Sequence, residues 1–338
     1  MMTVLRIGAA ALAAALFAAT GGAARAHDAP RIEEWTVPWE GTRPRDPAVA
    51  PDGRIWFVGQ RGHYLATLDP ATGRFWKRDL SDSPGPHNVV VGSDGIVWYT
   101  GNLKGYIGRY DPAADTIERI AMPDPQARDP HTLIFAPGGR VLWFTVQGGN
   151  RIGRLEIASR RVELVTVPSP RARPYGIAIA GDGHVWVALF GTNRLAEIDP
   201  ASKTLTEHPL PNATTRPRRI AAVRENGEVA IYYGDYANGR LGRYLPGRGR
   251  ISEWELPGGP GSRPYALAAD GRGRIWVAET GLRPNRLVAF DPAGGSFVHD
   301  LPVPSGGGTI RHMVYDPKAD AIWFGTDANT IGRLLLGP

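Results

Sequence analysis

The stretch "RPYGIAIAGDGHVWVALFGTNRLAEIDP", residues 173–200, decides the fold because similar stretches recur along the chain. A β-favouring run, "YGIAIA", meets an Asp-Gly turn and a second run, "HVWVAL", which is a hairpin signal. A polar loop and a third run, "NRLAEI", follow, and Asp199-Pro200 then turns the chain into a fourth run, "KTLTEHPL". One such unit predicts four antiparallel strands.

The tryptophan of this unit, Trp186, marks the repeat. In the other units the same apolar slot holds Trp56, Trp98, Trp143, Ile231, Trp276 and Trp323. Successive slots lie 42, 45, 43, 45, 45 and 47 residues apart. Four strands repeated at such a period are typical of a propeller. We therefore predict an all-β, seven-bladed β-propeller that forms a single domain over residues 27–338.

The two ends of the chain predict how the ring closes. The last unit stops after three strands, at "TIGRLLL", whereas "RIEEWTVP", residues 31–38, is a strand without a unit of its own. Pairing the two would remove an exposed strand edge. Because the chain contains no cysteine, we expect this pairing, and not a disulfide, to hold the ring together.

Residues 1–26 predict a secretory signal peptide. A basic residue, Arg6, precedes an Ala- and Leu-rich stretch, and Ala24-Arg25-Ala26 has the small-x-small pattern of a cleavage site. The apolar stretch falls short of the ~20 residues that span a bilayer. We expect an exported protein, periplasmic or secreted, with no stable membrane insertion after cleavage; an uncleaved anchor is the alternative.

The charge pattern limits the partners. The formal net charge is +6, and the arginines are spread through every repeat. Nucleic-acid-binding domains instead gather their basic residues on one face or helix. We predict no nucleic-acid partner, a monomer, and a small-molecule or cyclic-peptide ligand at the mouth of the central tunnel.

A ring of polar side chains is expected at that mouth. Counting back 11 to 13 residues from each slot gives Arg45, His87, His131, Tyr175, Arg218, Tyr265 and His312, most of them directly after a proline. Two arginines in such a ring favour an anionic or carbonyl-rich ligand. We predict that Arg45, Tyr175 and Arg218 bind the ligand; the alternative is a polar lining that an aqueous tunnel tolerates.

A second ring lies three residues past each slot, and Glu279 is its only charged member. We take Glu279 as a catalytic candidate, although a lone carboxylate in such a place is more often paired with a nearby arginine. Asp235 and Asp327, four residues past their slots, could add negative charge if their loops fold inward.

The repeated motifs resemble those of the streptogramin B lyase family, typified by virginiamycin B lyase. They are the "P-[HY]-x-[IL]" opening, the "DG-x-[IV]-W-[FVY]" hairpin, the "N-[RT]-[IL]-G-R" strand at residues 150–154 and 329–333, and endings such as "LPVP" at residues 301–304. The resemblance covers nearly the whole exported chain. It implies a propeller that opens a cyclic depsipeptide by elimination, with Mg²⁺ polarising the ester and a histidine removing the α-proton.

The family's site residues carry over only in part. The resemblance implies ring histidines in the last two blades, an acid two residues before the second, and an acid three past the last tryptophan. Those places hold Tyr265, His312, Ile310 and Thr326. His312 is therefore the predicted base, and Tyr265 and Glu279 complete the catalytic candidates; a hydrogen-bonded structural histidine is the alternative for His312.

A rotated copy of the same constellation falls on the second and third blades. His87 and His131 occupy the ring there, Asp129 lies two residues before the second histidine, and Val146 fills the remaining acid slot. Two imidazoles and a carboxylate suit a divalent metal with open positions for water. We predict a metal site at His87, His131 and Asp129; the alternative is that Asp129 caps a turn.

Three functions remain open at this stage. One is a lyase of the streptogramin B lyase type with an altered substrate. Another is a non-catalytic ligand-binding or scaffold propeller. The third is a propeller lactone hydrolase, in which a metal-bound water attacks an ester.

Overall fold

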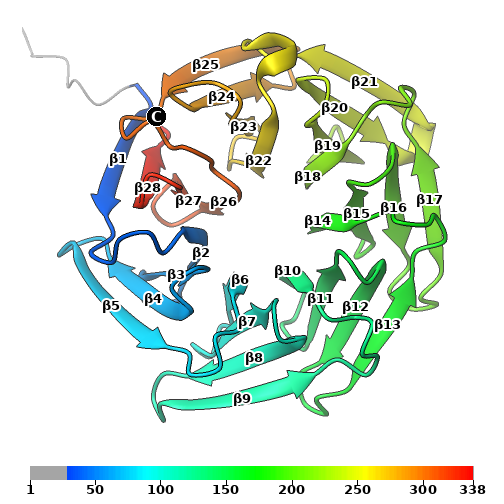
Figure 1. Cartoon of the computed structure of the whole chain (residues 1–338). Coiled ribbons are helices and arrows are strands. Elements are labelled where there is room, and N and C mark those ends of the chain that lie inside the picture. Colours follow the sequence, from blue (N-terminus) through cyan, green and yellow to red (C-terminus); the bar gives the residue numbers. More distant parts are fainter. Residues whose placement is uncertain (1–28, 338) are drawn as a thin grey trace, which may run out of the picture.

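The structure, a computed structural model, describes residues 29–337, and these form seven four-stranded antiparallel sheets around one axis (Figure 1). The predicted all-β, seven-bladed propeller is confirmed. Helix within residues 29–337 is limited to two 3-10 turns, η1 (Pro246–Arg248) and η2 (Gly259–Gly261). The predicted signal peptide, residues 1–26, lies outside the described residues.

Each blade follows the chain from the axis outward. The first blade holds β2 (Pro44–Val49), β3 (Ile55–Gly59), β4 (Tyr64–Asp69) and β5 (Arg74–Asp79), and the second holds β6 (Pro86–Val91), β7 (Val97–Gly101), β8 (Tyr106–Asp111) and β9 (Thr116–Ala121). The third holds β10 (Pro130–Phe135), β11 (Val141–Val146), β12 (Arg151–Glu156) and β13 (Val162–Thr166), and the fourth holds β14 (Pro174–Ile179), β15 (Val185–Leu189), β16 (Arg194–Ile198) and β17 (Leu205–Pro209). The fifth holds β18 (Pro217–Glu225), β19 (Glu228–Asp235), β20 (Arg240–Leu245) and β21 (Arg250–Glu255), and the sixth holds β22 (Pro264–Ala269), β23 (Ile275–Glu279), β24 (Arg286–Asp291) and β25 (Ser296–Pro302).

The seventh blade combines both ends of the chain. It contains β26 (Met313–Asp316), β27 (Ala321–Gly325) and β28 (Thr330–Leu335), and β1 (Arg31–Thr36) pairs antiparallel with β28 as its outermost strand (Figure 1). Trp35 of β1 stacks on Trp323 of β27, with ring centroids 5.6 Å apart. The N-terminal strand therefore covers the edge of β28 that would otherwise be open.

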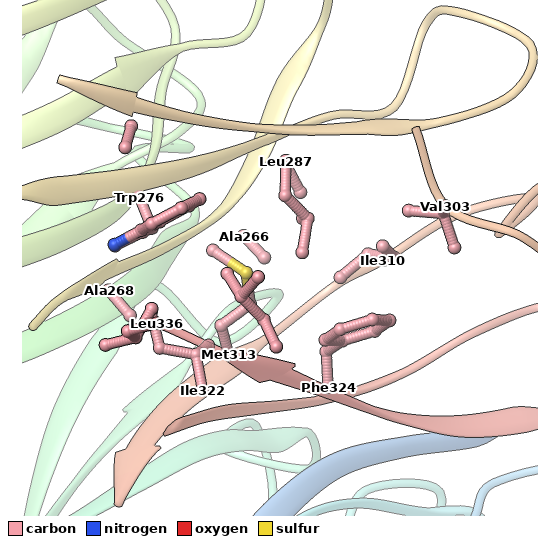
Figure 2. Packing of buried hydrophobic residues seen from close by; sticks show 13 residues of the cluster. Ala266, Ala268, Trp276, Leu287, Val303, Ile310, Met313, Ile322, Phe324 and Leu336 are labelled. Carbon is pink, nitrogen blue, oxygen red and sulfur yellow. The ribbon is translucent and has the colours of Figure 1, made fainter. Parts of the chain in front are cut away.

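The hydrophobic core lies between neighbouring blades. Between the sixth and seventh blades, Trp276 and Leu287 pack against Met313 and Phe324, and all four side chains are buried (Figure 2). Six further clusters of this kind occur among the described residues. Burying one such side chain stabilises the fold by roughly 1.5–3 kcal/mol. The tryptophan slots used to find the repeats are thus positions of blade-to-blade packing.

The innermost strands have a shared irregularity that shapes the axis. In the first six blades the innermost strand begins at a proline, and its register against the next strand shifts just after that residue. Proline has no N–H to donate, so it suits the first position of a strand. A bulge re-aims the side chains that follow it. The residues after each proline are the ones that reach the axis.

Candidate ligand site at the axis

The seven predicted ring residues, which we call the axial ring, lie at the starts of the innermost strands. Arg45, His87, His131, Tyr175 and Tyr265 are buried. Arg218 and His312 are partly exposed. Side chains span the axis at this level, where an open tunnel was expected: the hydroxyl of Tyr175 on the fourth blade meets that of Tyr265 on the sixth.

A second polar layer, which we call the inner network, comes from the residues that follow four of the seven ring residues. Its members are Asp46, Asn88, Thr132 and Arg219. All four side chains are buried. The sequence analysis missed this layer; the signal that could have found it is the bulge, which lets two consecutive residues turn toward the axis.

Asp46 is the electrostatic centre of the inner network. Its Oδ1 accepts from Arg45 Nε (2.9 Å), and its Oδ2 accepts from Arg219 Nη2 (3.1 Å) and from Asn88 Nδ2 (3.1 Å). Burial alone would raise the pKa of Asp46, but Arg45 and Arg219 outweigh it and hold that pKa well below its usual range. Asp46 also has a φ of 48°, an uncommon backbone conformation for a residue other than glycine.

Arg219 joins blades that are far apart in the ring. Besides Asp46 on the first blade, it donates from Nη1 to Thr132 Oγ1 (3.0 Å) on the third and from Nε to the carbonyl oxygen of Arg311 (3.0 Å) next to the seventh. Every donor nitrogen of this guanidinium thus has a partner. Arg219 is a structural cross-brace and is not free to bind a ligand.

The two buried ring histidines stack on each other and on Tyr175. The ring centroids of His87 and His131 are 3.6 Å apart, and those of His131 and Tyr175 are 4.2 Å apart. His87 Nδ1 donates to the carbonyl oxygen of His131 (3.2 Å), and the Thr132 hydroxyl lies 2.9 Å from His131 Nδ1. Burial, with the nearby arginines, lowers the pKa of both histidines well below the ordinary value, so both rings are neutral at pH 7.

Arg218 is surrounded by aromatic rings. Its Cζ lies 3.5 Å from the ring centroid of Tyr265, 4.3 Å from that of Tyr236, 4.7 Å from that of Phe190 and 5.0 Å from that of Tyr175. Such cation–π contacts favour a guanidinium in this cage. Within residues 29–337 its one hydrogen bond is a long one, from Nη2 to the Tyr175 hydroxyl (3.5 Å), and its buried Nε has no acceptor.

The tyrosine pair next to Arg218 is electrostatically unequal. Burial raises the pKa of Tyr265 to about 12. Burial would raise the pKa of Tyr175 too, but Arg218, Arg219 and Arg45 outweigh it and lower that pKa below its ordinary value. Tyr175 is therefore the more acidic of the two hydroxyls that meet at the axis.

The axial ring and inner network together carry an excess of positive charge. Arg45, Arg218 and Arg219 contribute three guanidinium groups, and Asp46 is the one carboxylate that pairs with any of them among the described residues. Arg45 also has a buried Nη2 without an acceptor, although its Nη1 donates to Gln60 (3.0 Å). Unpaired buried donors and charges are costly, so the site is complementary to an anion or to carbonyl oxygens.

His312 differs from the other ring histidines. It is partly exposed, and within residues 29–337 it has no hydrogen-bond partner. Burial of the ring nitrogens, with a smaller contribution from Arg219, lowers the pKa of His312 to about 4. The imidazole is therefore neutral at pH 7 and can accept a proton, but as a weak base.

Glu279 is buried at the end of β23, opposite Pro264 in the register with β22. Its Oε1 accepts from the Gly258 N–H (2.8 Å), and its Oε2 has no partner. In the described chain it forms no ion pair; its cross-strand partner, Arg286, pairs with Asp300. Burial raises the pKa of Glu279, and no hydrogen bond links it to Tyr265 or His312.

Each of the three predicted metal ligands has a hydrogen-bond partner in the described chain. The Asp129 carboxylate accepts from Gly148 N–H (2.5 Å) and Gly149 N–H (3.1 Å), as in the turn-capping alternative. Among the described residues no group of three or more His, Asp or Glu side chains is arranged to hold a metal. Metal binding at His87, His131 and Asp129 stays a prediction.

The two positions where the resemblance implies acids hold residues with structural contacts. Ile310 packs in the core between the sixth and seventh blades (Figure 2), and the Thr326 hydroxyl bonds that of Thr330 (2.8 Å). The loop acids considered as substitutes are also engaged. Asp235 accepts from the Arg216 N–H (3.0 Å), and Asp327 pairs with Arg311.

Comparisons with known proteins agree with this architecture. A model of the virginiamycin B lyase family matches residues 15–198, more than half of the chain. The structure of virginiamycin B lyase from Staphylococcus aureus has a TM-score of 0.80 at 23% identity, with 91% of this chain and 99% of that chain covered. The same values hold for a catalytically inactive variant of that enzyme with quinupristin.

Other similar structures have different functions. Hydrazine synthase from Kuenenia stuttgartiensis matches with a TM-score of 0.69 at 15% identity, covering 86% of this chain and 95% of that one. The extracellular domain of a one-component system from B. thetaiotaomicron matches with a TM-score of 0.65 at 18% identity, covering 90% of this chain and 40% of that one. At these identities the likeness shows the fold alone.

A search of the curated proteins found no match. Within residues 29–337 there is no helix with the length and apolar character to cross a bilayer.

Proposed function

The chain belongs to the virginiamycin B lyase family, and from that premise we propose that it is an exported ligand-binding propeller. Its axial ring would hold a small molecule or cyclic peptide through carboxylate or carbonyl oxygens. Arg218 carries the proposal: it is a partly exposed cation with one 3.5 Å hydrogen bond and no carboxylate partner in the described chain. A guanidinium presents five N–H donors, and oxygens of a ligand are the groups that match them.

The neighbours of Arg218 favour a ligand with a flat or apolar body. Phe190 and Tyr236 flank the guanidinium and are themselves partly exposed, so a ligand bound to Arg218 would also contact their rings. Aromatic walls with a few convergent polar groups are typical of small-molecule sites. Quinupristin, which accompanies the related S. aureus enzyme, is a natural first probe of the carbonyl-rich class.

Titration calorimetry with quinupristin and with benzoate tests the proposal. We expect Arg218→Gln to weaken binding of either probe at least tenfold, because it removes the charge and most of the donors. Arg250→Gln is the matched control, since Arg250 is an exposed arginine at the far end of the fifth blade. Equal affinities of the two variants would contradict the proposal.

A lyase is the second candidate, and His312 favours it. Its imidazole is neutral, partly exposed and unbonded within residues 29–337, so it can accept a proton from the carbon next to the one that bears the ester's alkyl oxygen. In such an elimination the C–H electrons form a carbon–carbon double bond as the ester C–O bond breaks, and a carboxylate leaves. No atom is added, so the product is an isomer of the substrate.

Mass spectrometry of quinupristin after incubation separates the candidates. A linear product of unchanged mass that His312→Gln abolishes would support the lyase. A product that gains one water would instead indicate the lactone hydrolase, and unchanged substrate would leave the binding function. Parallel reactions with Mg²⁺ and with a chelator would test the metal prediction.

Export is part of the proposal. The signal-like residues 1–26 support it. Sequencing the N-terminus of the protein from a periplasmic or culture fraction tests it. We expect the chain to begin at His27; an intact Met1 in the membrane fraction would indicate the anchor instead.

A further inference from the structure

Beside the axial ring, three arginines and an aromatic ring line a surface hollow of about 520 Å³, which we call the outer hollow. Its lining includes Arg171, Arg173, Arg216 and Phe190. The loop that precedes β14 supplies the first two arginines, and the loop that precedes β18 supplies the third. All of these loops lie at the end of the blades where the axial ring sits.

None of the three arginines is neutralised. Arg216 donates from Nη1 to the carbonyl oxygens of Ala213 (3.0 Å) and Thr215 (2.7 Å), and among the described residues Arg171, Arg173 and Arg216 form no ion pair. Two carboxylates bond to lining residues through backbone N–H groups: Asp129 accepts from Gly148 and its neighbour Gly149, and Asp235 accepts from Arg216. Three unpaired cations around one hollow form a focused positive field.

The backbone beside the hollow has positive φ values, as it does at Arg43 and Arg263, which precede the innermost strands of two other blades. Arg171 and Arg173 have φ values of 52° and 53°, a conformation uncommon outside glycine. Gly191 lets their loop approach closely, because a Cβ there would lie 2.1 Å from the Arg171 carbonyl oxygen. The Phe190 N–H and the Gly191 N–H hold the loop by donating to the carbonyl oxygens of Arg173 (3.2 Å) and Ala172 (2.7 Å).

Phe190 connects the outer hollow to the axial ring. It lines the hollow, and its ring centroid also lies 4.7 Å from Arg218 Cζ and 5.5 Å from the Tyr175 ring. A ligand that covers Phe190 would therefore reach the arginines of the hollow at one end and Arg218 at the other. Guanidinium groups bind phosphate, sulfate and carboxylate oxygens in a bidentate manner.

We infer that the outer hollow is a subsite for an anionic oxygen group, such as phosphate, sulfate or carboxylate, on a ligand whose aromatic or apolar body lies on Phe190. The inference deepens the proposed function and rests on it, because Phe190 belongs to both places. It narrows the ligand from carbonyl-rich molecules in general to those with an anionic substituent on a flat body.

Calorimetric titration with phenyl phosphate, inorganic phosphate and phenol tests the subsite. The key variant is Arg171→Gln with Arg173→Gln, two exposed side chains whose loss leaves the core intact. The matched control is Arg140→Gln with Arg250→Gln, which removes the same charge from exposed positions at the opposite end of the blades. We expect the key variant to bind phenyl phosphate at least tenfold more weakly and the control to stay within twofold of the parent.

The aromatic contribution has its own readout. Phe190→Leu should weaken phenyl phosphate several-fold and leave inorganic phosphate unchanged, because the alkyl side chain keeps the loop packed but offers no ring face. Equal phenyl phosphate affinity for the key variant and the control would overturn the subsite. If Phe190→Leu changes the affinities for phenyl phosphate and inorganic phosphate equally, the ligand's aromatic body does not lie on Phe190.

The two sets of titrations also distinguish failure of this inference from failure of the proposed function. If Arg218→Gln weakens benzoate but the key variant leaves phenyl phosphate unaffected, the outer hollow is refuted and the axial site stands. If the key variant loses phenyl phosphate while Arg218→Gln leaves benzoate unchanged, the outer hollow stands and the axial site is refuted.

Discussion

Arg219 Nη2 donates to Asp46 Oδ2 at 3.1 Å across the axis, which joins the fifth blade to the first. The same carboxylate holds Arg45, and neither arginine has another acidic partner in the described chain. A buried ion cluster of this kind adds little net stability over apolar packing, but it is costly to break. It fixes the relative positions of blades that share no strand pairing.

Asp46→Asn should therefore destabilise the propeller strongly. The amide leaves two buried guanidinium groups without a counter-charge, and we expect a loss of about 3–5 kcal/mol in urea unfolding. Asp52→Asn is the control: Asp52 is an exposed turn residue, and its replacement should change stability by less than about 0.5 kcal/mol. A loss for Asp46→Asn as small as the control's would show that the inner network is not needed for the fold.

The Asp46 carboxylate also predicts how the stability of the fold depends on pH. The pKa of Asp46 is lowered in the folded protein, so its contribution is fully present above its ordinary value of 3.8 and is lost as the pH falls below it. The stability gap between the parent and Asp46→Asn should therefore shrink when unfolding is measured at pH 3 instead of pH 7. A stability gap that widens as the pH falls would contradict the lowered pKa of Asp46.

The effect of Glu279→Gln on stability should depend on pH in the opposite direction. Burial raises the pKa of Glu279, so the folded state binds the proton more tightly than the unfolded state, and the cost of the charged form appears as the pH rises above 4.5. Relative to the parent, we expect the Tm of the variant to rise by about 2 °C between pH 4 and pH 7. A relative Tm that falls over this range would indicate that the carboxylate is stabilised by a charge.

Tyr175 should ionise before the other buried tyrosines. The lowered pKa of Tyr175 contrasts with the raised pKa of Tyr265, and both follow from the surrounding arginines and burial. In an alkaline absorbance titration we expect a tyrosinate step below pH 10 that disappears in Tyr175→Phe and persists in Tyr265→Phe. Loss of the step in Tyr265→Phe alone would reverse the two roles.

The sequence predicted the blades because their period is carried by residues with one structural task. The tryptophan slots, Trp186 among them, pack between blades, and the two-strand closure at β1 and β28 follows from one missing strand. The axial ring was predicted for the same reason, since an offset of 11 to 13 residues before the slot falls just after a proline in six of the seven blades. A feature that returns in every repeat can be recognised in a single sequence.

The chemistry of the site was harder to predict because it differs from blade to blade. Asp46 and Arg219 meet across the axis although they are 173 residues apart, and no periodic signal links them. Asp129 has the spacing of a metal ligand but caps the loop at Gly148. Only three-dimensional contacts show which polar residue is already satisfied and which, like Arg218, is left with donors to spare.

The central claim is that Arg218 holds an anionic or carbonyl oxygen of a ligand at the axis. Anomalous diffraction from crystals soaked in bromide tests it most directly, because bromide is a small anion that guanidinium donors bind and that can be located by its scattering. The account predicts a bromide peak within hydrogen-bonding distance of Arg218. Bromide peaks on other surface arginines with none at Arg218 would contradict it.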